Sequence, residues 1–353
     1  MSTIVIRADA NVEIGFGHVG RCLTLAHALR ARGHEARFVC RSVSPGFAER
    51  IRVEGFELLV PPPLDREDAG DLAHSAWLGV SQAADAEATL AVAGGFDAVV
   101  VDHYALDARW ESRVGAGCAV LAIDDLTDRR HACDVLLNQN PTHADAYSAL
   151  VPERARVCLG PHYALLRPEF IEARKLAEVR ESARGVVVFL GGADGSGATL
   201  FVLDALDADR VRSLDLDVDV LVGSANPAGD VIENRCRVAG YRVHVDSVEI
   251  PRLLGEADLA VGAAGSSAWE RACVGLPTIM LCVAENQRPI AQSVDALGVG
   301  VYAGDLGSLS AGRLAERIAD VAQQGLDSMS RRAFDLVDGG GCSRVADAFE
   351  AVL

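Results

Sequence analysis

Short apolar segments with strand character alternate with helical segments from one end of the chain to the other. The segments are apolar at consecutive positions, which is typical of parallel strands covered by helices on both faces. We expect strands at residues 3–7, 35–40, 56–60, 98–101, 119–123 and 135–137, and, after the pattern restarts, at residues 186–190, 218–222, 242–245, 259–261, 278–282 and 299–302. This order predicts an α/β fold of two doubly wound, Rossmann-like halves facing each other across a cleft.

The length of 353 residues suits two domains, each large enough to bury its own core. We expect a first domain at residues 1–165, a linker with Pro168 and a charged run at residues 166–184, and a second domain at residues 185–353. A final helix near residues 342–353 could pack on either half, including the N-terminal one. Three prolines at 61–63 and the acidic residues up to Asp71 predict an exposed loop.

The formal net charge of −17 makes nucleic acid and anionic membranes poor partners, because such a surface repels phosphate. An anionic small molecule would need local donors, such as helix N-termini and glycine loops. The nine cysteines include no CxxC pair, the start of the chain has no leader pattern, and the histidines are dispersed. We therefore expect a cytoplasmic monomer that uses neither a metal ion nor a cofactor.

Ligands of parallel sheets bind beyond the carboxyl ends of the strands, so the loops there are the candidate sites. The first such loop carries Gly15, Gly17 and His18. The glycines let backbone N–H groups approach a ligand, and a neutral imidazole at a helix start is a competent general base. A capping loop with an incidental histidine is the alternative.

Two loops of the second half suit a nucleotide. In one, Gly265, Ser266 and Ser267 could hold an anion, and Glu270, one turn further on, could accept hydrogen bonds from a ribose diol. The alternative is an ordinary serine N-cap with a capping box. In the other loop, Asn286 and Gln287 suit sugar hydroxyls or phosphate, although a polar first helical turn is equally consistent with them.

Three weaker features complete the candidates. Tyr104 follows a buried strand and could present its phenol to the cleft, whereas Asp102 and His103 are expected to form a buried pair that holds the loop. The turn with Gly191 and Gly192 would offer backbone donors, or is an ordinary tight turn. Two further aspartates, 124 and 125, are interpreted as a solvated strand end and not as a cation site.

These loops together resemble known proteins. The run Gly-Ala-Ala-Gly-Ser-Ser with Glu-Arg, Gly-Leu-Pro and Glu-Asn-Gln after it resembles the nucleotide-binding half of GT-B proteins, such as the membrane-associated transferase of peptidoglycan synthesis. The glycine turn resembles that of the UDP-sugar hydrolases of pseudaminic acid biosynthesis, which usually have Thr where Ala193 stands. Further motifs similar to these hydrolases lie at residues 7–9, 14–18, 21, 102–104, 136–138 and 163–170.

The resemblance spans residues 4 to about 300 and implies a GT-B fold. It implies metal-independent hydrolysis of UDP-2,4-diacetamido-2,4,6-trideoxy-β-L-altropyranose to UDP and the free hexose, with His18 as general base for water attack at the anomeric carbon. The substrate-binding set that goes with it contains Gly15, Gly17, Arg21, Tyr104, Gly191, Gly192, Val245, Gly265, Ser266, Ser267, Glu270, Asn286 and Gln287. A glycosyltransferase with a UDP-sugar donor, or a hydrolase of a related UDP-deoxyamino sugar, remains the alternative.

Overall fold

The first strand shows why apolar residues stand at consecutive positions. In the computed structural model, which describes residues 1–11, 13–65, 70–192 and 194–353, Ile4 and Ile6 belong to one buried cluster with Leu23 and Phe349. Val5, between them, belongs to a second cluster on the other face of the sheet. Both faces of this sheet are therefore buried, as the sequence pattern predicts.

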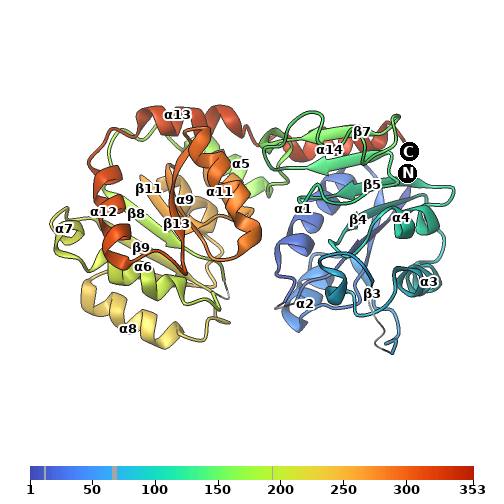
Figure 1. Cartoon of the computed structure of the whole chain (residues 1–353), viewed down its shortest axis with the longest axis horizontal. Helices are drawn as coiled ribbons and strands as arrows, with labels where there is room; N and C mark the ends of the chain where they lie inside the picture. The colour runs from blue at the N-terminus through green and yellow to red at the C-terminus, as the bar shows by residue number, and fades with distance from the viewer. Residues whose placement is uncertain (12, 66–69, 193) are drawn as a thin grey trace. The chain divides into compact units, whose positions relative to one another are not determined.

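The chain divides into two units, one formed by Met1–Leu165 with Gly340–Leu353 and the other by Leu166–Gly339 (Figure 1). The first unit holds a seven-stranded parallel sheet in the order β3-β2-β1-β4-β5-β6-β7. Its strands are β1 (Thr3–Ala8), β2 (Glu35–Val39), β3 (Glu57–Leu59), β4 (Ala98–Asp102), β5 (Ala119–Ile123), β6 (Val135–Asn138) and β7 (Arg156–Leu159).

Helices cover both faces of this sheet. The cluster with Ile4 includes residues of α1, α2 and α14, and the cluster with Val5 includes residues of α3 and α4. The helical elements are α1 (Gly17–Ala31), α2 (Pro45–Val53), η1 (Ser75–Trp77), α3 (Gln82–Ala93), α4 (Ala108–Val114), η2 (Pro161–Tyr163) and α14 (Gly341–Glu350). The final helix thus packs in the first unit.

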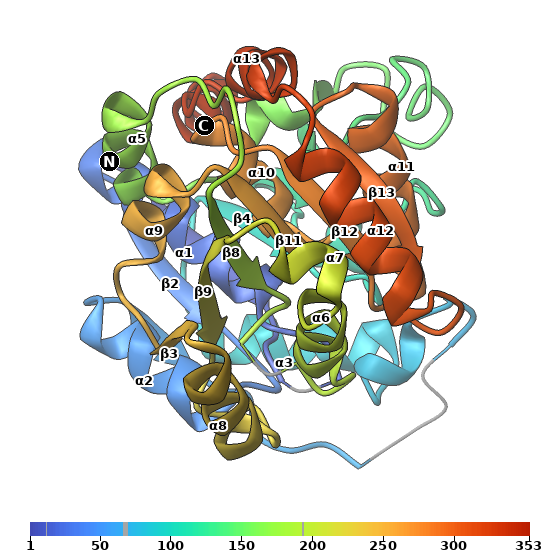
Figure 2. The ribbon, with the colours of Figure 1, turned by 90° about the vertical axis from the view of Figure 1, so that its left-hand side faces the viewer.

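The second unit holds a six-stranded parallel sheet in the order β10-β9-β8-β11-β12-β13 (Figure 2). Its strands are β8 (Gly185–Phe189), β9 (Asp217–Val222), β10 (Arg242–Val245), β11 (Leu259–Ala263), β12 (Thr278–Cys282) and β13 (Gly300–Asp305). Its helices are α5 (Pro168–Leu176), α6 (Ala198–Leu206), α7 (Asp209–Arg212), α8 (Gly229–Ala239), α9 (Ile250–Glu256), α10 (Ser267–Cys273), η3 (Glu285–Gln287), α11 (Arg288–Ala296), α12 (Ala311–Ala322) and α13 (Asp327–Leu336).

The predicted fold class, two doubly wound α/β halves, is confirmed by these sheets. The sequence pattern missed β7, whose four residues carry an exposed arginine at the edge of the sheet. The stretch expected as a linker contains α5, which packs against α9 and α10 within the second unit. Position 193, where the sequence departs from its resemblance, lies outside the described residues.

The order of strands reverses at one place in each sheet. β1 lies between β2 and β4, with Ile4 opposite both Ala36 and Ala98, so the first sheet changes direction between β1 and β4. The second sheet changes direction between β8 and β11. Ligands of doubly wound sheets bind at these switch points, beyond the carboxyl ends of the strands.

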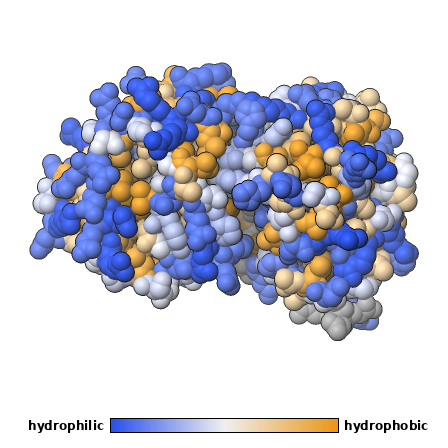
Figure 3. Space-filling view, turned by 45° about the horizontal axis from the view of Figure 1, so that its top comes forward, coloured by the Kyte–Doolittle hydropathy of each residue, from blue (hydrophilic) through white to orange (hydrophobic). Residues whose placement is uncertain are grey.

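Among the described residues, no helix combines the length and the apolar character that a bilayer span requires. Figure 3 shows a face on which hydrophilic residues predominate, while hydrophobic residues form separate small patches.

Candidate active site

The loop between β1 and α1 brings His18 to the switch point of the first sheet. Gly15 adopts a φ of +86°, a left-handed conformation that favours glycine, and its N–H donates to the carbonyl of Asn11 at 2.8 Å. α1 then begins at Gly17, so the His18 side chain lies in its first turn. There the imidazole Nδ1 lies 2.6 Å from Oδ1 of Asp102, the last residue of the neighbouring β4.

Asp102 is fully buried and is held by Arg21 from the next turn of α1. Arg21 Nε donates to Oδ2 at 2.6 Å, and Arg21 Nη2 donates to Oδ1 at 2.7 Å. Burial acts to raise the pKa of Asp102, but Arg21 and His18 outweigh it and hold this pKa well below its usual range. Asp102 is therefore a permanent carboxylate.

The Asp102 carboxylate fixes the tautomer of His18. A carboxylate can only accept a hydrogen bond, so Nδ1 of His18 carries a proton, and Nε2 is the nitrogen that accepts in the neutral imidazole. Within the described residues, no hydrogen bond engages that Nε2. His18 as a whole residue is 7% exposed. An imidazole oriented by a buried aspartate is the arrangement of a general base.

Tyr104 supports this histidine from the side. Its ring packs edge-on against the His18 imidazole, with centroids 4.6 Å apart and planes at 81°. Its hydroxyl donates to Oδ2 of Asp125 at 2.6 Å, and Asp125 also accepts from Arg21 at 2.7 Å. Burial, and next the Asp125 charge, raise the pKa of Tyr104 well above its usual range. Because the hydroxyl already donates to Asp125, its oxygen offers a ligand acceptor capacity, and the contact of Tyr104 with ligand stays a prediction.

His103 is structural, as expected, although its partner is different. Its Nδ1 accepts the N–H of Ala105 at 3.1 Å, and its Nε2 lies 3.3 Å from Asp9. Asp9 in turn pairs with Arg7 at 2.7 Å, deep in the unit. The expected Asp102–His103 pair does not form, since Asp102 faces α1 across the switch point.

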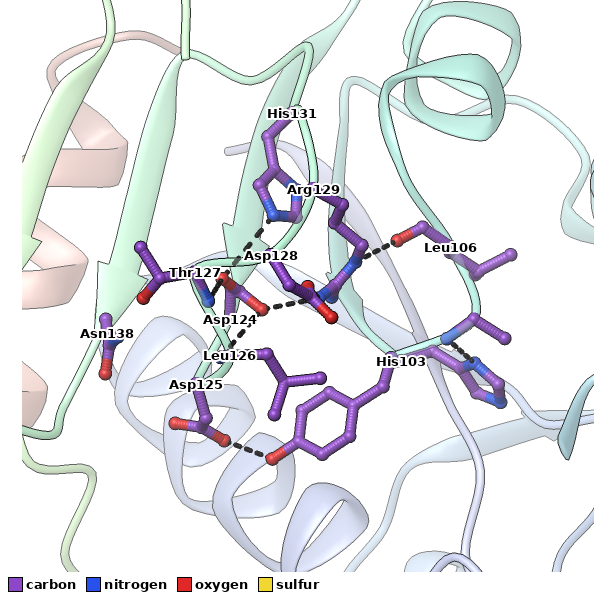
Figure 4. A network of polar contacts seen from close by, with 12 residues as sticks. His103, Leu106, Asp124, Asp125, Leu126, Thr127, Asp128, Arg129, His131 and Asn138 are labelled. Carbon is purple, nitrogen blue, oxygen red and sulfur yellow. Dashed lines mark hydrogen bonds and ion pairs between the residues drawn. The ribbon is translucent and has the colours of Figure 1, made fainter. Parts of the chain in front are cut away.

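The strand end at Asp124 is not solvated, contrary to the expectation. Figure 4 shows Asp124 bound to Arg129, at 2.7 Å, with His131 beside it at 3.7 Å. His131 Nδ1 also lies 2.7 Å from Glu111. Burial acts to lower the pKa of His131, but Asp124 and Glu111 raise it to about 9. This buried network stabilises the loop after β5, which presents Asp125 to Tyr104.

In the second unit, the loop after β11 depends on Arg271. Arg271 is 1% exposed, donates to the Ala263 carbonyl at 2.8 Å and to Ser267 Oγ at 3.0 Å, and burial lowers its pKa to about 10. A Cβ at Gly262 would lie 2.7 Å from the Arg271 guanidinium, so any other residue there would displace it. The buried Arg271 side chain thus holds the loop at residues 262–267 in place, and Ser266 is an exposed residue of this loop.

The loop after β12 lies beside it. A Cβ at Gly265 would lie 3.9 Å from Gln287 Nε2, and Gln287 Oε1 accepts the N–H of Val283 at 3.1 Å. Asn286 is exposed, and in the described part of the chain its side chain has no hydrogen-bond partner. The structure therefore brings the serine loop and Gln287 together at one edge of the sheet.

Glu270 does not form the capping box that was the alternative. The N-cap of α10 is Ser266, which makes no side-chain cap bond, and Glu270 is the fourth residue of the helix. Burial raises the pKa of Glu270, against the opposing charges of Arg167 and Arg271. No described group hydrogen-bonds its partly buried carboxylate, which is consistent with a role in binding.

The glycine turn after β8 lies at the other side of the switch point. Gly191 has a φ of +102°, and a Cβ at Gly223 would lie 2.2 Å from the Gly192 carbonyl oxygen, so the loops after β8 and β9 touch. Asp194 accepts the N–H groups of Ala198 at 2.9 Å and Thr199 at 2.7 Å. The start of α6 therefore already holds an anion. Val245, at the end of the edge strand β10, is 46% exposed and lies two strands away from β8.

Sequence reasoning did not assign Asp102, Asp125 or Arg271 to the site. Asp102 was considered only as a partner of His103. The usable signal was topological: a carboxylate that ends the first strand after the reversal faces the helix that follows β1. Nothing in the spacing of Asp125 or Arg271 indicates their partners.

Comparisons with known proteins agree with this architecture. No family model matches the chain. It is 25% identical over 292 residues, 82% of its length, to the UDP-2,4-diacetamido-2,4,6-trideoxy-β-L-altropyranose hydrolase of Campylobacter jejuni, of which the match covers 94%. It is also 30% identical over 161 residues, 45% of its length, to the spore coat polysaccharide biosynthesis protein SpsG of Bacillus subtilis, of which 47% is covered.

Solved structures extend the likeness to nearly the whole chain. MurG of Acinetobacter baumannii superposes with a TM-score of 0.62 at 13% identity, over 99% of both chains. The calicheamicin glycosyltransferase CalG4 gives a TM-score of 0.64 at 18% identity, over 99% of this chain and 98% of that one. The chain thus has the GT-B fold of these glycosyltransferases and is a sequence relative of the UDP-2,4-diacetamido-2,4,6-trideoxy-β-L-altropyranose hydrolase.

Proposed function

We propose that the chain is a hydrolase that releases UDP from UDP-2,4-diacetamido-2,4,6-trideoxy-β-L-altropyranose. The observation that carries the proposal is His18, whose Nδ1 is bound to a buried carboxylate at 2.6 Å while its Nε2 is free among the described residues. The Campylobacter jejuni relative, which is 25% identical in sequence, is named for this reaction. The cytoplasm, where nucleotide-sugars are made, is the compartment that the proposal assigns to it.

In this proposal, the second unit binds UDP at its switch point. The backbone N–H groups of the serine loop and the turn at Gly191 and Gly192 contact the diphosphate, and Ser266 adds a hydroxyl. Glu270 accepts hydrogen bonds from the ribose hydroxyls, which explains an otherwise unpartnered carboxylate among the described groups. The exposed amide of Asn286 suits the sugar or the phosphate next to it.

His18 then acts on the sugar that this nucleotide carries. Nε2 accepts a proton from a water molecule while the water oxygen attacks the anomeric carbon, and the bond from that carbon to the UDP oxygen breaks with its electron pair. Asp102 stabilises the imidazolium that forms. UDP is a stable anion, so it leaves without a separate acid, and attack from the opposite side inverts the anomeric centre.

The test uses the UDP-sugar without any acceptor and measures UDP release. We expect release by the wild-type protein and a loss of about 10²–10⁴-fold in kcat for His18→Asn, the range of a missing general base. UDP affinity, measured by calorimetry, should stay nearly unchanged in this variant because His18 does not contact UDP. A protein that binds the UDP-sugar but never releases UDP would contradict the proposal.

A glycosyltransferase is the second candidate, because the structural neighbours are glycosyltransferases. It would use the same nucleotide loops, with an acceptor hydroxyl in place of water. UDP release that requires an added sugar or lipid acceptor would favour it. A hydrolase of a related UDP-deoxyamino sugar would show instead as faster turnover of another member of a UDP-sugar panel.

A further inference from the structure

An aromatic group that the proposed mechanism does not use lies beside His18. Trp77 stacks on Tyr104, with ring centroids 5.8 Å apart and planes at 26°. His74 packs on Trp77 at 4.4 Å and on Tyr104 at 5.5 Å. Because Tyr104 also packs against the His18 imidazole, with ring centroids 4.6 Å apart, these rings form one continuous cluster beside the proposed base.

The chain brings this group to the site from a segment that the sequence analysis treated only as a loop. The connection from β3 to α3 leaves the carboxyl end of β3, the edge at which ligands bind. Within it, η1 is anchored by two buried neighbours, Leu78 and Val80, and by a hydrogen bond from Ser75 Oγ to the Gly70 carbonyl at 3.0 Å. Trp77 is therefore held in place before any ligand binds.

Packing alone does not account for Trp77. The other two tryptophans, Trp110 and Trp269, are 0% exposed, whereas Trp77 is partly exposed. The indole N–H of Trp110 donates to Asp85 at 2.9 Å, as is usual for a structural tryptophan. In the described part of the chain, neither the indole of Trp77 nor the imidazole of His74 makes a side-chain hydrogen bond.

This group of rings is aromatic and carries two N–H donors, one on the Trp77 indole and one on the His74 imidazole. Burial lowers the pKa of His74, so its ring is neutral and presents an aromatic face. An aromatic face packs well on the C–H groups of a sugar ring and on methyl groups, and the free indole N–H suits a carbonyl or hydroxyl oxygen. A hexose with a C6 methyl and acetamido groups offers both kinds of group.

We propose that Trp77, against which His74 packs, is a specificity-determining residue for the sugar. It contacts the hexose of the UDP-sugar and selects a deoxy, N-acylated ring. The inference rests on the proposed function, since it names the part of the site that recognises the sugar of that substrate. Trp77 binds the sugar and takes no part in proton transfer. Its contribution is therefore the same in the ground state and the transition state.

The kinetic test compares Trp77→Ala with Trp77→Phe on the deoxy UDP-sugar. We expect Trp77→Ala to raise KM about tenfold with little change in kcat, because uniform binding is lost, and Trp77→Phe to stay within about threefold of wild type. Tyr241→Ala, immediately before β10, is the matched control and should leave KM unchanged. An unchanged KM in Trp77→Ala, or a loss confined to kcat, overturns the inference.

A binding readout remains decisive if Trp77→Ala does not fold. Because Trp110 and Trp269 are fully buried, quenching of tryptophan emission by acrylamide reports on Trp77, and Trp77→Phe should abolish it. We expect the free hexose product to protect Trp77 from acrylamide and UDP alone to leave the quenching unchanged. If the wild-type protein hydrolyses the UDP-sugar but saturating hexose leaves Trp77 accessible to acrylamide, the inference about Trp77 is wrong and the proposed function still stands. If wild type releases no UDP, the proposed function fails first.

Discussion

Replacing Asp102 by asparagine tests the part of the site that orients the base. Arg21 Nε reaches Oδ2 at 2.6 Å and Arg21 Nη2 reaches Oδ1 at 2.7 Å, so the asparagine NH2 meets an Arg21 donor in either orientation. With the NH2 at the Oδ1 position, the amide also donates to His18 Nδ1, and the proton of His18 moves to Nε2, which can no longer accept one from water. In both orientations the carboxylate that stabilises the imidazolium is lost.

The size of the effect follows from the loss of this carboxylate. An asparagine in place of the aspartate of such a pair lowers kcat by about 10⁴-fold, or about 5 kcal/mol in activation free energy. The assay is UDP release under saturating UDP-sugar, with UDP affinity measured in parallel and expected to remain unchanged. Thermal unfolding should show that the variant still folds.

The matched control lies at the other end of the same strand. Asp97 precedes β4, is exposed and accepts the N–H of Thr3 at 2.8 Å. Asp97→Asn makes the same chemical change at the amino end of the sheet and should leave kcat within about a factor of two. If Asp102→Asn retains more than about a tenth of the wild-type kcat, the role given to the Asp102 carboxylate is refuted.

Three further predictions concern stability and nucleotide binding. The pKa of His131 is raised to about 9 in the folded state, so its charge stabilises the fold fully below the unfolded pKa of about 6.5. This contribution is lost as the pH rises towards 9. His131→Gln should therefore lower the Tm at about pH 6 much more than at about pH 9.5. Burial raises the pKa of Glu270, so its charged form destabilises the fold at neutral pH. Glu270→Gln should raise the Tm at about pH 7.5, and this gain should disappear on acidification. The same variant should weaken UDP binding in calorimetry. Gly262→Ala places a Cβ 2.7 Å from Arg271 and should lower UDP affinity by about tenfold or more while the free hexose still binds; unchanged affinity would contradict the role given to the serine loop.

The parallel sheets could be predicted from the sequence because their strands are buried on both faces. Ile4, Val5 and Ile6 all lie in the core, so the run of apolar residues is itself the signal. β7 escaped prediction because it is a short edge strand with an exposed arginine, and nothing in four residues distinguishes it from a loop. Most other element bounds differ by about one or two residues, where caps decide the ends.

The site was predictable only at the level of loops. Glycines and a helix start marked His18, but its partner Asp102 is 84 residues away and becomes visible only once β1 and β4 are known to be neighbours. Trp77 was missed for a different reason. It lies in a connection without a periodic pattern, and its position beside Tyr104 is set by tertiary packing of the residues that follow it.

Hydrolysis of the UDP-sugar in water enriched with ¹⁸O, with no acceptor present, tests the central claim most directly. The account predicts UDP release with the heavy oxygen in the anomeric hydroxyl of the free hexose, because the water activated by His18 attacks carbon. It also predicts that His18→Asn slows this incorporation and leaves its position unchanged. Heavy oxygen in the β-phosphate of UDP, or no UDP release without an acceptor, would contradict it.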